Sequence, residues 1–312
     1  MRSPISSVIP SAMFSLLCAS LAACGTSSMP TTHIGGPCDA SNKCDDGQVC
    51  DRTAPSGQVC VDAAGDMDGD GIPNGKDFCE HMAGGAFDED GDGIGDECDS
   101  CPIAAPTGQA ETDGDAVTSP CDPDTRTAGD KIILFNGFNA AVSGAGANWK
   151  FQNGEAIVTP TDPTTVEQLV LPVVATSNQL AVFAAYQIDS TAAVAATADA
   201  GVGSKTVLPL GTSVIQCGGS RAQGADQVLL FQVDANQGTT QSTKAVASAF
   251  DTAAKYRVVE QIDGPNANCA VAGASMANSG ATQLATDGST PTNVVLYARG
   301  ATVRFSYIMV VQ

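Results

Sequence analysis

Two short stretches of the chain restrict its fold more than any other feature. The first reads Asp66-Met67-Asp68-Gly69-Asp70-Gly71, and the second reads Asp88-Glu89-Asp90-Gly91-Asp92-Gly93. Each places three carboxylates on alternate residues and then a glycine, which permits a turn that a Cβ would hinder. A loop of this kind can wrap a hard cation, because Ca²⁺ prefers about six to eight oxygen ligands. The two stretches therefore predict calcium-binding loops.

The predicted ligands follow a twelve-residue register that starts at the first Asp of each stretch. Side chains supply most of the oxygens, and position seven offers its backbone carbonyl. An EF-hand fits less well, because position twelve is Asp rather than a bidentate Glu and no helical pattern flanks either loop. An acidic, disordered linker is the alternative that composition alone would favour. The predicted ligands are Asp66, Asp68, Asp70, Ile72, Asn74 and Asp77 in the first loop, and Asp88, Asp90, Asp92, Ile94, Asp96 and Asp99 in the second.

Cysteines keep a fixed register with these loops. Cys79 stands at position 14 of the first unit, and Cys98 and Cys101 stand at positions 11 and 14 of the second. Together with the Cys-Asp-x-Cys-Pro sequence that begins at Cys98, the pattern over about residues 64–125 resembles the thrombospondin type 3 repeat. This resemblance implies a chain that wraps around bound Ca²⁺, with little hydrophobic core and with disulfides between neighbouring units.

A third unit of the repeat is irregular. It has Glu111 in place of the first Asp and Ala116 in place of the glycine, so we do not expect a complete cation site there. Its cysteine, Cys121, nevertheless stands at position 11. The disulfides that the resemblance implies are Cys79 with Cys98 and Cys101 with Cys121.

The start of the chain is typical of a targeting segment. Arg2 precedes a mostly apolar run that is shorter than the ~20 residues needed to cross a bilayer. Leu21-Ala22-Ala23-Cys24 resembles a bacterial lipoprotein signal box. The resemblance implies a signal peptide over 1–23, a lipid on Cys24 and a tether over 24–36; an ordinary secretory signal or an uncleaved anchor is the alternative. We therefore expect a lipid-anchored protein of the bacterial cell envelope, in the outer membrane or at the cell surface.

Each of the three modules at 37–63, 64–129 and 130–312 contains an even number of cysteines, which suits an oxidising, extracytoplasmic compartment. Zinc is a poor alternative, because neither of the two histidines has a ligand-like spacing with cysteines. The first module has too little apolar content for a core, so disulfides must hold it, and three pairings of its cysteines remain open. Its cysteines are Cys38, Cys44, Cys50 and Cys60, and the last module contains Cys217 and Cys269, which we expect to form a disulfide.

Charge is distributed unevenly along the chain. The net charge is −20, and 22 of the 34 acidic residues lie in 24–129. The excess of acid therefore belongs to the cation-binding segment. No basic patch is visible in either half, which argues against a nucleic acid as partner.

Residues 130–312 predict an antiparallel β-sandwich. About ten short apolar segments recur between Gly, Asn, Ser, Thr and Pro turns, and no long segment has helical periodicity. In the last segment, alternation places Val303, Phe305, Tyr307, Met309 and Val311 on one face. Thr191–Ala200 is Ala-rich, and its flanks favour a loop. The whole chain is expected to be mainly β, a sandwich preceded by a Cys-rich module and an irregular, calcium-wrapped repeat stalk.

The order of motifs in this last module resembles the concanavalin A-like/laminin G-like jelly roll. The segments that carry the resemblance are Leu134–Phe138, Trp149–Glu155, Tyr256–Gly264, Cys269–Gly273 and Val303–Val310. The family includes lectins and glycosidases, so it implies either binding or hydrolysis of carbohydrate. Exposed aromatic residues that stack on sugar rings would mark a glycan-binding face, although Trp149 is read more readily as a packing residue.

Catalysis is the less favoured of these functions. Glycosidases of this kind usually need two convergent carboxylates. The nearest candidates, Glu260 and Asp263, have opposite parity on a strand, and we place them at a solvated strand edge and a hairpin turn. No histidine follows His81, so a Ser-His-Asp arrangement cannot be built in 130–312. We expect a calcium-binding surface lipoprotein without catalytic residues, whose sandwich serves adhesion or carbohydrate binding; a glycosidase and a purely structural stalk are the alternatives. The partners expected are calcium ions, the membrane through the lipid, and a surface glycan or protein.

Overall fold

The computed structural model covers the modules after the N-terminal segment. The signal peptide predicted over 1–23 and the lipidation predicted at Cys24 lie outside the described residues. Within the described part of the chain, no helix is long and apolar enough to cross a membrane, and the one helical element there is the short 3₁₀ turn η1 (Asn74–Lys76). The described residues are 34–105, 113–192, 197–209, 211–234, 236, 238–273, 281–286 and 288–312.

The Cys-rich module (37–63) is built on one hairpin. Its strands are β1 (Gln48–Asp51) and β2 (Val59–Asp62), which pair in antiparallel register. Of the three pairings that the sequence left open, the structure has Cys38–Cys50 and Cys44–Cys60. Two cross-links therefore replace the apolar core that this short segment cannot supply.

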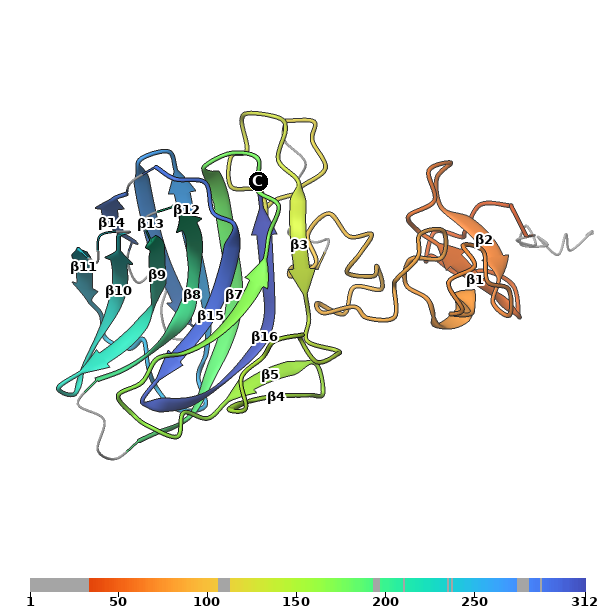
Figure 1. The fold of residues 1–312 in the computed structure, drawn as a ribbon. Helices are drawn as coiled ribbons and strands as arrows, with labels where there is room; N and C mark the ends of the chain where they lie inside the picture. Colours follow the sequence, from red (N-terminus) through yellow and green to blue (C-terminus); the bar gives the residue numbers. More distant parts are fainter. Residues whose placement is uncertain are drawn as a thin grey trace, which may run out of the picture.

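Two antiparallel sheets face each other in the sandwich (130–312), as Figure 1 shows. The larger sheet has the strand order β14-β13-β12-β7-β16-β5-β4, with β3 also paired to β16, and the smaller has β11-β10-β9-β8-β15-β6. The chain is thus mainly β, with the expected jelly-roll type of sandwich. The strands are β3 (Ile132–Asn136), β4 (Trp149–Gln152), β5 (Glu155–Val158), β6 (Glu167–Pro172), β7 (Gln179–Thr191), β8 (Thr197–Leu208), β9 (Gly211–Ala222), β10 (Ala225–Val233), β11 (Thr239–Ala245), β12 (Lys255–Asp263), β13 (Asn266–Gly273), β14 (Ala281–Ala285), β15 (Asn293–Arg299) and β16 (Ala301–Val311).

Aromatic side chains fill the space between the sheets. The rings of Trp149 and Phe305 stack with centroids 6.0 Å apart, and those of Tyr186 and Tyr256 stack at 5.4 Å. All four side chains are buried, as alternation along their strands requires. Trp149 is therefore a packing residue, as its sequence context favoured.

We expected a loop within Thr191–Ala200, but the last residues of this range belong to strand β8. Thr197 begins this strand, and Ala198, Ala200 and Val202 face the core. Alanine and glycine predominate here, and a Cβ at Gly201 would collide with the carbonyl of Cys217 on the neighbouring strand. The small residues therefore allow close approach of two strands rather than marking a turn.

We expected one apolar face along the last strand, but a bulge in β16 divides its apolar residues between two faces. The register of β16 against β7 shifts between Phe305 and Tyr307. Phe305 consequently faces the core, whereas Tyr307 and Met309 point to the outer face of the larger sheet. An extra residue in one strand reverses the alternation beyond it, so both faces of β16 are buried.

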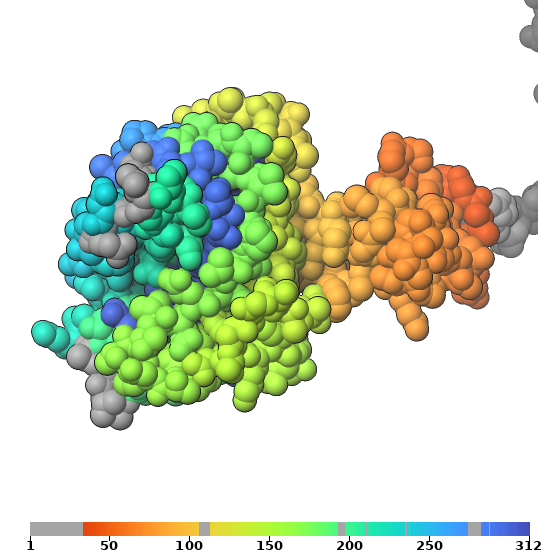
Figure 2. All heavy atoms as spheres, viewed as in Figure 1, coloured from red at the N-terminus to blue at the C-terminus, as the bar shows by residue number. Residues whose placement is uncertain are grey.

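The repeat segment (64–129) covers the outer face that this bulge creates. Figure 1 shows its loops beside β3 and β16. Figure 2 shows the Cys-rich module and the first unit as a lobe that stands apart from the sandwich. The end of the repeat segment is thus packed on the sandwich rather than extended as a stalk. The residues in contact are Cys101, Ile103, Val117 and Cys121 of the repeat segment with Ala181, Phe183, Tyr307, Met309 and Val311 of the sheet.

Candidate metal centres

Each of the two predicted loops gathers its first three carboxylates. Asp66, Asp68 and Asp70 offer oxygens that lie within 4.8 Å of one another. The second loop has the same arrangement, in which Asp88, Asp90 and Asp92 offer oxygens within 4.8 Å of one another. The spacing in the sequence therefore produces convergence in space, as alternate residues of a tight loop should.

Backbone N–H groups hold the carboxylates of the first loop in place. Asp66 accepts from Gly69 N at 2.8 Å and from Gly71 N at 3.1 Å. Asp68 Oδ1 accepts from Asp70 N at 3.1 Å, and Asp70 Oδ1 accepts from the N–H group of Ile72 at 2.7 Å. The positive φ of Gly69 and Gly71 lets the chain turn its N–H groups toward Asp66.

Equivalent bonds hold the second loop. Asp88 accepts from Gly91 N and from Gly93 N, both at 2.7 Å. Asp90 Oδ1 accepts from Asp92 N at 3.0 Å, and Asp92 Oδ1 accepts from Ile94 N at 2.7 Å. Two loops of different sequence thus reach one geometry, because the Asp and Gly positions determine it.

Several carboxylates use one oxygen for the backbone and keep the other for a ligand. The Oδ2 atoms of Asp68, Asp77, Asp90 and Asp92 are buried and have no hydrogen-bond partner. Burial, and then repulsion from Asp68 and its neighbours, raises the pKa of Asp77. Burial and the charge of Asp92 likewise raise the pKa of Asp90. An oxygen-rich cluster with unsatisfied, mutually repelling carboxylates fits a calcium ion, which removes both costs.

The residues predicted at position nine are hydrogen-bonded within their own loops. Asn74 Oδ1 accepts from Met67 N at 3.0 Å, and Asp96 Oδ1 accepts from Glu89 N at 2.8 Å. Both side chains are buried. At position twelve, Asp99 is buried and its Oδ1 accepts from the N–H group of Cys101 at 2.8 Å.

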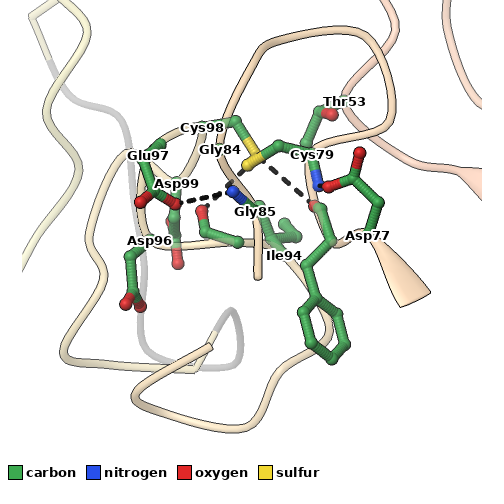
Figure 3. The surroundings of a disulfide bond; sticks show 12 residues. Thr53, Asp77, Cys79, Gly84, Gly85, Ile94, Asp96, Glu97, Cys98 and Asp99 are labelled. Atoms are coloured by element: carbon green, nitrogen blue, oxygen red, sulfur yellow. Dashed lines mark hydrogen bonds between the residues drawn. A yellow bond between two sulfur atoms is a disulfide. The ribbon is translucent and has the colours of Figure 1, made fainter. Parts of the chain in front are cut away.

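Disulfides join the units with the partners that the thrombospondin-type register implies. Cys79 pairs with Cys98, and Cys101 pairs with Cys121. Figure 3 shows the first of these bonds beside Asp77, whose Oδ1 accepts from Cys79 N at 2.8 Å. Each cross-link is therefore attached directly to a position-twelve carboxylate of a loop.

Arg52 of the Cys-rich module reaches the second loop, a contact that the sequence did not signal. Its Nη2 donates to the carbonyl of Asp92 at 2.7 Å and lies 3.5 Å from Asp92 Oδ1. A guanidinium at this distance partly neutralises a carboxylate that a cation would otherwise bind. The contact also fastens the module to the repeat segment.

We expected Glu260 at a solvated strand edge, and this expectation was wrong. β12 lies between β7 and β13, and the Glu260 side chain is fully buried between the two sheets. Its Oε1 accepts from Ser204 Oγ at 2.9 Å, and its Oε2 has no hydrogen-bond partner. Burial raises its pKa to about 8, against the smaller lowering by Ser204. The sequence around Glu260 did not indicate that β13 would pair with β12 and cover this edge.

Asp263 points away from Glu260, as the parity argument predicted. It is exposed, and its Oδ1 accepts from Gln179 Nε2 at 2.9 Å. Next to Glu260 in the neighbouring strand is Cys269, which forms the disulfide with Cys217 of the facing sheet. Glu260 and Asp263 therefore cannot act together on one substrate.

No Trp or Tyr of the chain is available for stacking on a sugar ring. Trp149 is 6% exposed, and none of the four tyrosines is more than 4% exposed. Tyr297 lies on the outer side of the smaller sheet. Its hydroxyl group is so close to Gly218 that a Cβ on this residue would collide with it. The aromatic residues that the sequence offered as a binding platform are thus all used in packing.

Comparison with known proteins gave structural similarities at low identity. No family model matches the chain, and no curated protein matches it significantly. The CBM2 module of the evolved Dit protein of Lactobacillus casei BL23 phage J-1 is similar at 10% identity, over 58% of this chain and 95% of that chain, with a TM-score of 0.42. The GlcNAcα1-4Gal-releasing endo-β-galactosidase from Clostridium perfringens has 12% identity over 62% of this chain and 65% of its own, with a TM-score of 0.43. A non-specific endo-β-1,3(4)-glucanase of family GH16 has 10% identity over 59% and 91%, with a TM-score of 0.41. At these identities and TM-scores, the similarities carry no argument about the activity of this chain.

Proposed function

We propose that this chain is a calcium-binding surface protein, in which two cation loops order the segment that carries a β-sandwich. The observation that supports it best is the pair of three-carboxylate groups, which contain a buried oxygen without a hydrogen-bond partner on each of Asp68, Asp90 and Asp92. Carboxylates at a surface without a ligand would instead expose their oxygens to water. Asp68, Asp90 and Asp92 keep an oxygen away from water, which favours a cation between them.

Calcium would act on this segment by removing repulsion. The three carboxylates of each loop lie close enough to destabilise the folded loop when all are ionised. A divalent ion converts this repulsion into shared attraction, and binding to the folded form alone adds about 2.7 kcal/mol at about 100 times the Kd. The disulfides Cys79–Cys98 and Cys101–Cys121 limit how far the ion-free segment can unfold.

The sandwich would then be the part of the chain that binds a partner. We propose adhesion to a surface protein or glycan without catalysis, at the outer membrane or cell surface, with the lipid on Cys24 as anchor. The buried position of Glu260 supports a non-catalytic role over a glycosidase, since that carboxylate cannot touch a polysaccharide. Because its Trp and Tyr side chains are buried, a glycan would have to be held by polar groups. Binding to a glycan array with and without Ca²⁺ distinguishes a glycan from a protein partner.

Asp90→Asn tests the calcium proposal, with Asp162→Asn as its matched control. Asp162 also accepts a hydrogen bond from a backbone N–H two residues ahead, but it is exposed and far from other carboxylates in sequence. Calcium added to the full chain should protect 66–77 and 88–99 from hydrogen exchange. Asp90→Asn should remove the protection of 88–99 and weaken binding there at least tenfold, whereas Asp162→Asn should change neither. Unchanged exchange in both loops on addition of Ca²⁺ would refute the proposal.

A further inference from the structure

The irregular third unit contains a carboxylate with an unsatisfied oxygen. Asp122, its position-twelve residue, is 8% exposed. Its Oδ1 accepts from Asp124 N at 2.8 Å, whereas its Oδ2 is buried without a hydrogen-bond partner. A buried acceptor left without a donor destabilises the fold, and more so when it is charged. Asp122 is therefore in the same condition as Asp77 of the first unit.

Asp130 lies beside Asp122, although it stands outside the twelve residues of the unit. Its Oδ2 is also buried without a hydrogen-bond partner. Burial, followed by the negative charge of Asp122, raises the pKa of Asp130 to about 6. The principal causes of this shift include a second carboxylate, Asp115, and no positive charge. Two neighbouring carboxylates with inward, unsatisfied oxygens are an arrangement that a divalent cation relieves.

A comparison with the first unit explains how Asp130 reaches this place. Asp70 Oδ2 accepts from Gly84 N at 2.9 Å, and Asp115 Oδ2 accepts from Gly129 N at 3.1 Å. Both bonds join position five to a glycine at the same distance along the chain. The first and third units therefore share this fold of the backbone, despite the loss of the first Asp and the turn glycine.

Gly85 and Asp130 are equivalent positions by this register. A Cβ at Gly85 would collide with Asp77 Oδ1, so this position directly faces the position-twelve carboxylate of the first unit. The third unit carries Asp130 there and Asp122 opposite. A carboxylate is thus added at a position where the first unit has a glycine.

We propose that the third unit binds its own divalent cation, of the calcium class, through Asp122 and Asp130. By register, Asp113 and Asp115 of this unit correspond to Asp68 and Asp70, and Asp115 Oδ2 accepts a hydrogen bond from Asp130 N at 2.8 Å. The site goes beyond the two proposed loops because Asp130 belongs to no repeat motif. The cation would join the end of the repeat segment to the start of the sandwich.

The surroundings of Asp130 give this site a structural consequence. The next residue, Lys131, exchanges two backbone hydrogen bonds with Gln312, each 2.9 Å long. Asp115 also accepts from Asp130 N at 2.8 Å. An ion at Asp122 and Asp130 would therefore fix the chain where it enters β3 and where β16 ends.

Counting calcium ions on the full chain by native mass spectrometry tests this proposal. The wild type should bind three ions, and Asp130→Asn should bind two. Asp124→Asn is the control, because Asp124 lies in the same turn but its Oδ1 accepts only from the exposed Arg126 N–H, at 3.3 Å. The control should still bind three ions. Hydrogen exchange should show that Ca²⁺ protects 113–131 in the wild type and in Asp124→Asn but not in Asp130→Asn.

The possible results separate this site from the two loops. Two ions on the wild type, with calcium-dependent protection confined to 66–77 and 88–99, would overturn the third site and leave the proposed function intact. An unchanged count in Asp130→Asn would also overturn it. A wild type that binds no calcium would overturn both proposals. Because Asn has nearly the shape of Asp, an unchanged melting temperature in EDTA would show that Asp130→Asn remains folded.

Discussion

The repeat segment and the sandwich place carboxylates in opposite surroundings. Asp88, Asp90 and Asp92 lie together, and each gives at least one oxygen to backbone N–H groups. Glu260 lies alone between two sheets, where Ser204 is the one hydrogen-bond donor to its carboxylate. In our proposal a cation relieves the first arrangement, whereas a proton relieves the second. One functional group thus makes two regions of one chain sensitive to different solution conditions.

The interactions that stabilise the sandwich also differ from those that stabilise the repeat segment. In the sandwich, large side chains such as Phe305 and Tyr186 are buried between sheets. In the repeat segment, the fully buried apolar residues are chiefly the cysteines of its disulfides. Burial of apolar area stabilises the sandwich by itself. The repeat segment instead depends on cross-links, on Asp-to-backbone hydrogen bonds and, in our proposal, on ions.

Phe305→Ala gives the largest effect expected to separate the two regions. It removes a ring that stacks on Trp149 and should destabilise the sandwich by about 3–5 kcal/mol, by leaving a cavity. Calcium affinity of the loops should change less than twofold. Val207→Ala is the control, because Val207 is 61% exposed and should lose little stability. Chemical denaturation followed by calorimetric titration measures both quantities; a parallel loss of calcium affinity would mean that the two regions unfold as one unit.

Glu260→Gln should give an effect that depends on pH. The folded pKa of about 8 exceeds the ordinary value of 4.5, so the folded state keeps a proton that the unfolded state has lost. Wild-type stability should therefore fall as pH rises from about 4.5 to about 8. The variant should lack this dependence and be more stable at pH 9, on the order of 5 kcal/mol, because the shift spans roughly 3.5 pKa units and one unit corresponds to about 1.4 kcal/mol.

Thermal melts of both proteins from pH 4 to pH 9 measure the Glu260 effect. The two should have similar stability at pH 4, where the wild-type carboxyl is protonated in both states. A wild-type stability that rises between pH 5 and pH 8 relative to the variant would show that Glu260 is stabilised as an anion. That outcome would remove the contrast between the two regions.

Arg52→Gln should give the smallest effect, and it sharpens the comparison within the repeats. Loss of the guanidinium beside Asp92 should raise the calcium affinity of the second loop about two- to fivefold, because its positive charge no longer repels the cation. Lys43→Gln, at an exposed position of the same module, should leave the affinity unchanged. Titration in low and high salt checks the cause, since the difference should shrink as salt screens the charge. A weaker second loop in Arg52→Gln would instead assign Arg52 a supporting role.

Local patterns in the sequence were enough to predict some of this structure. The alternate Asp residues and the glycines specify the loops, because their hydrogen bonds span only a few residues. The sandwich class followed from recurrent short apolar segments. Features that depend on distant partners were not predictable: the bulge before Tyr307, the cover over the outer face, and the reach of Arg52 to Asp92 over 40 residues. The expected edge position of Glu260 was wrong for the same reason, since the neighbouring strand decides it.

The apolar outer face of β16 also has a consequence for biogenesis. The repeat segment is synthesised before this strand, yet it packs on Tyr307, Met309 and Val311. Its disulfides are local, with partners 19 and 20 residues apart, so their formation does not depend on the later strands. Packing on the sheet must wait for β16, which lies between β7 and β5 in the larger sheet. A copy cut before Ala301 would therefore have a repeat segment without the surface on which it packs.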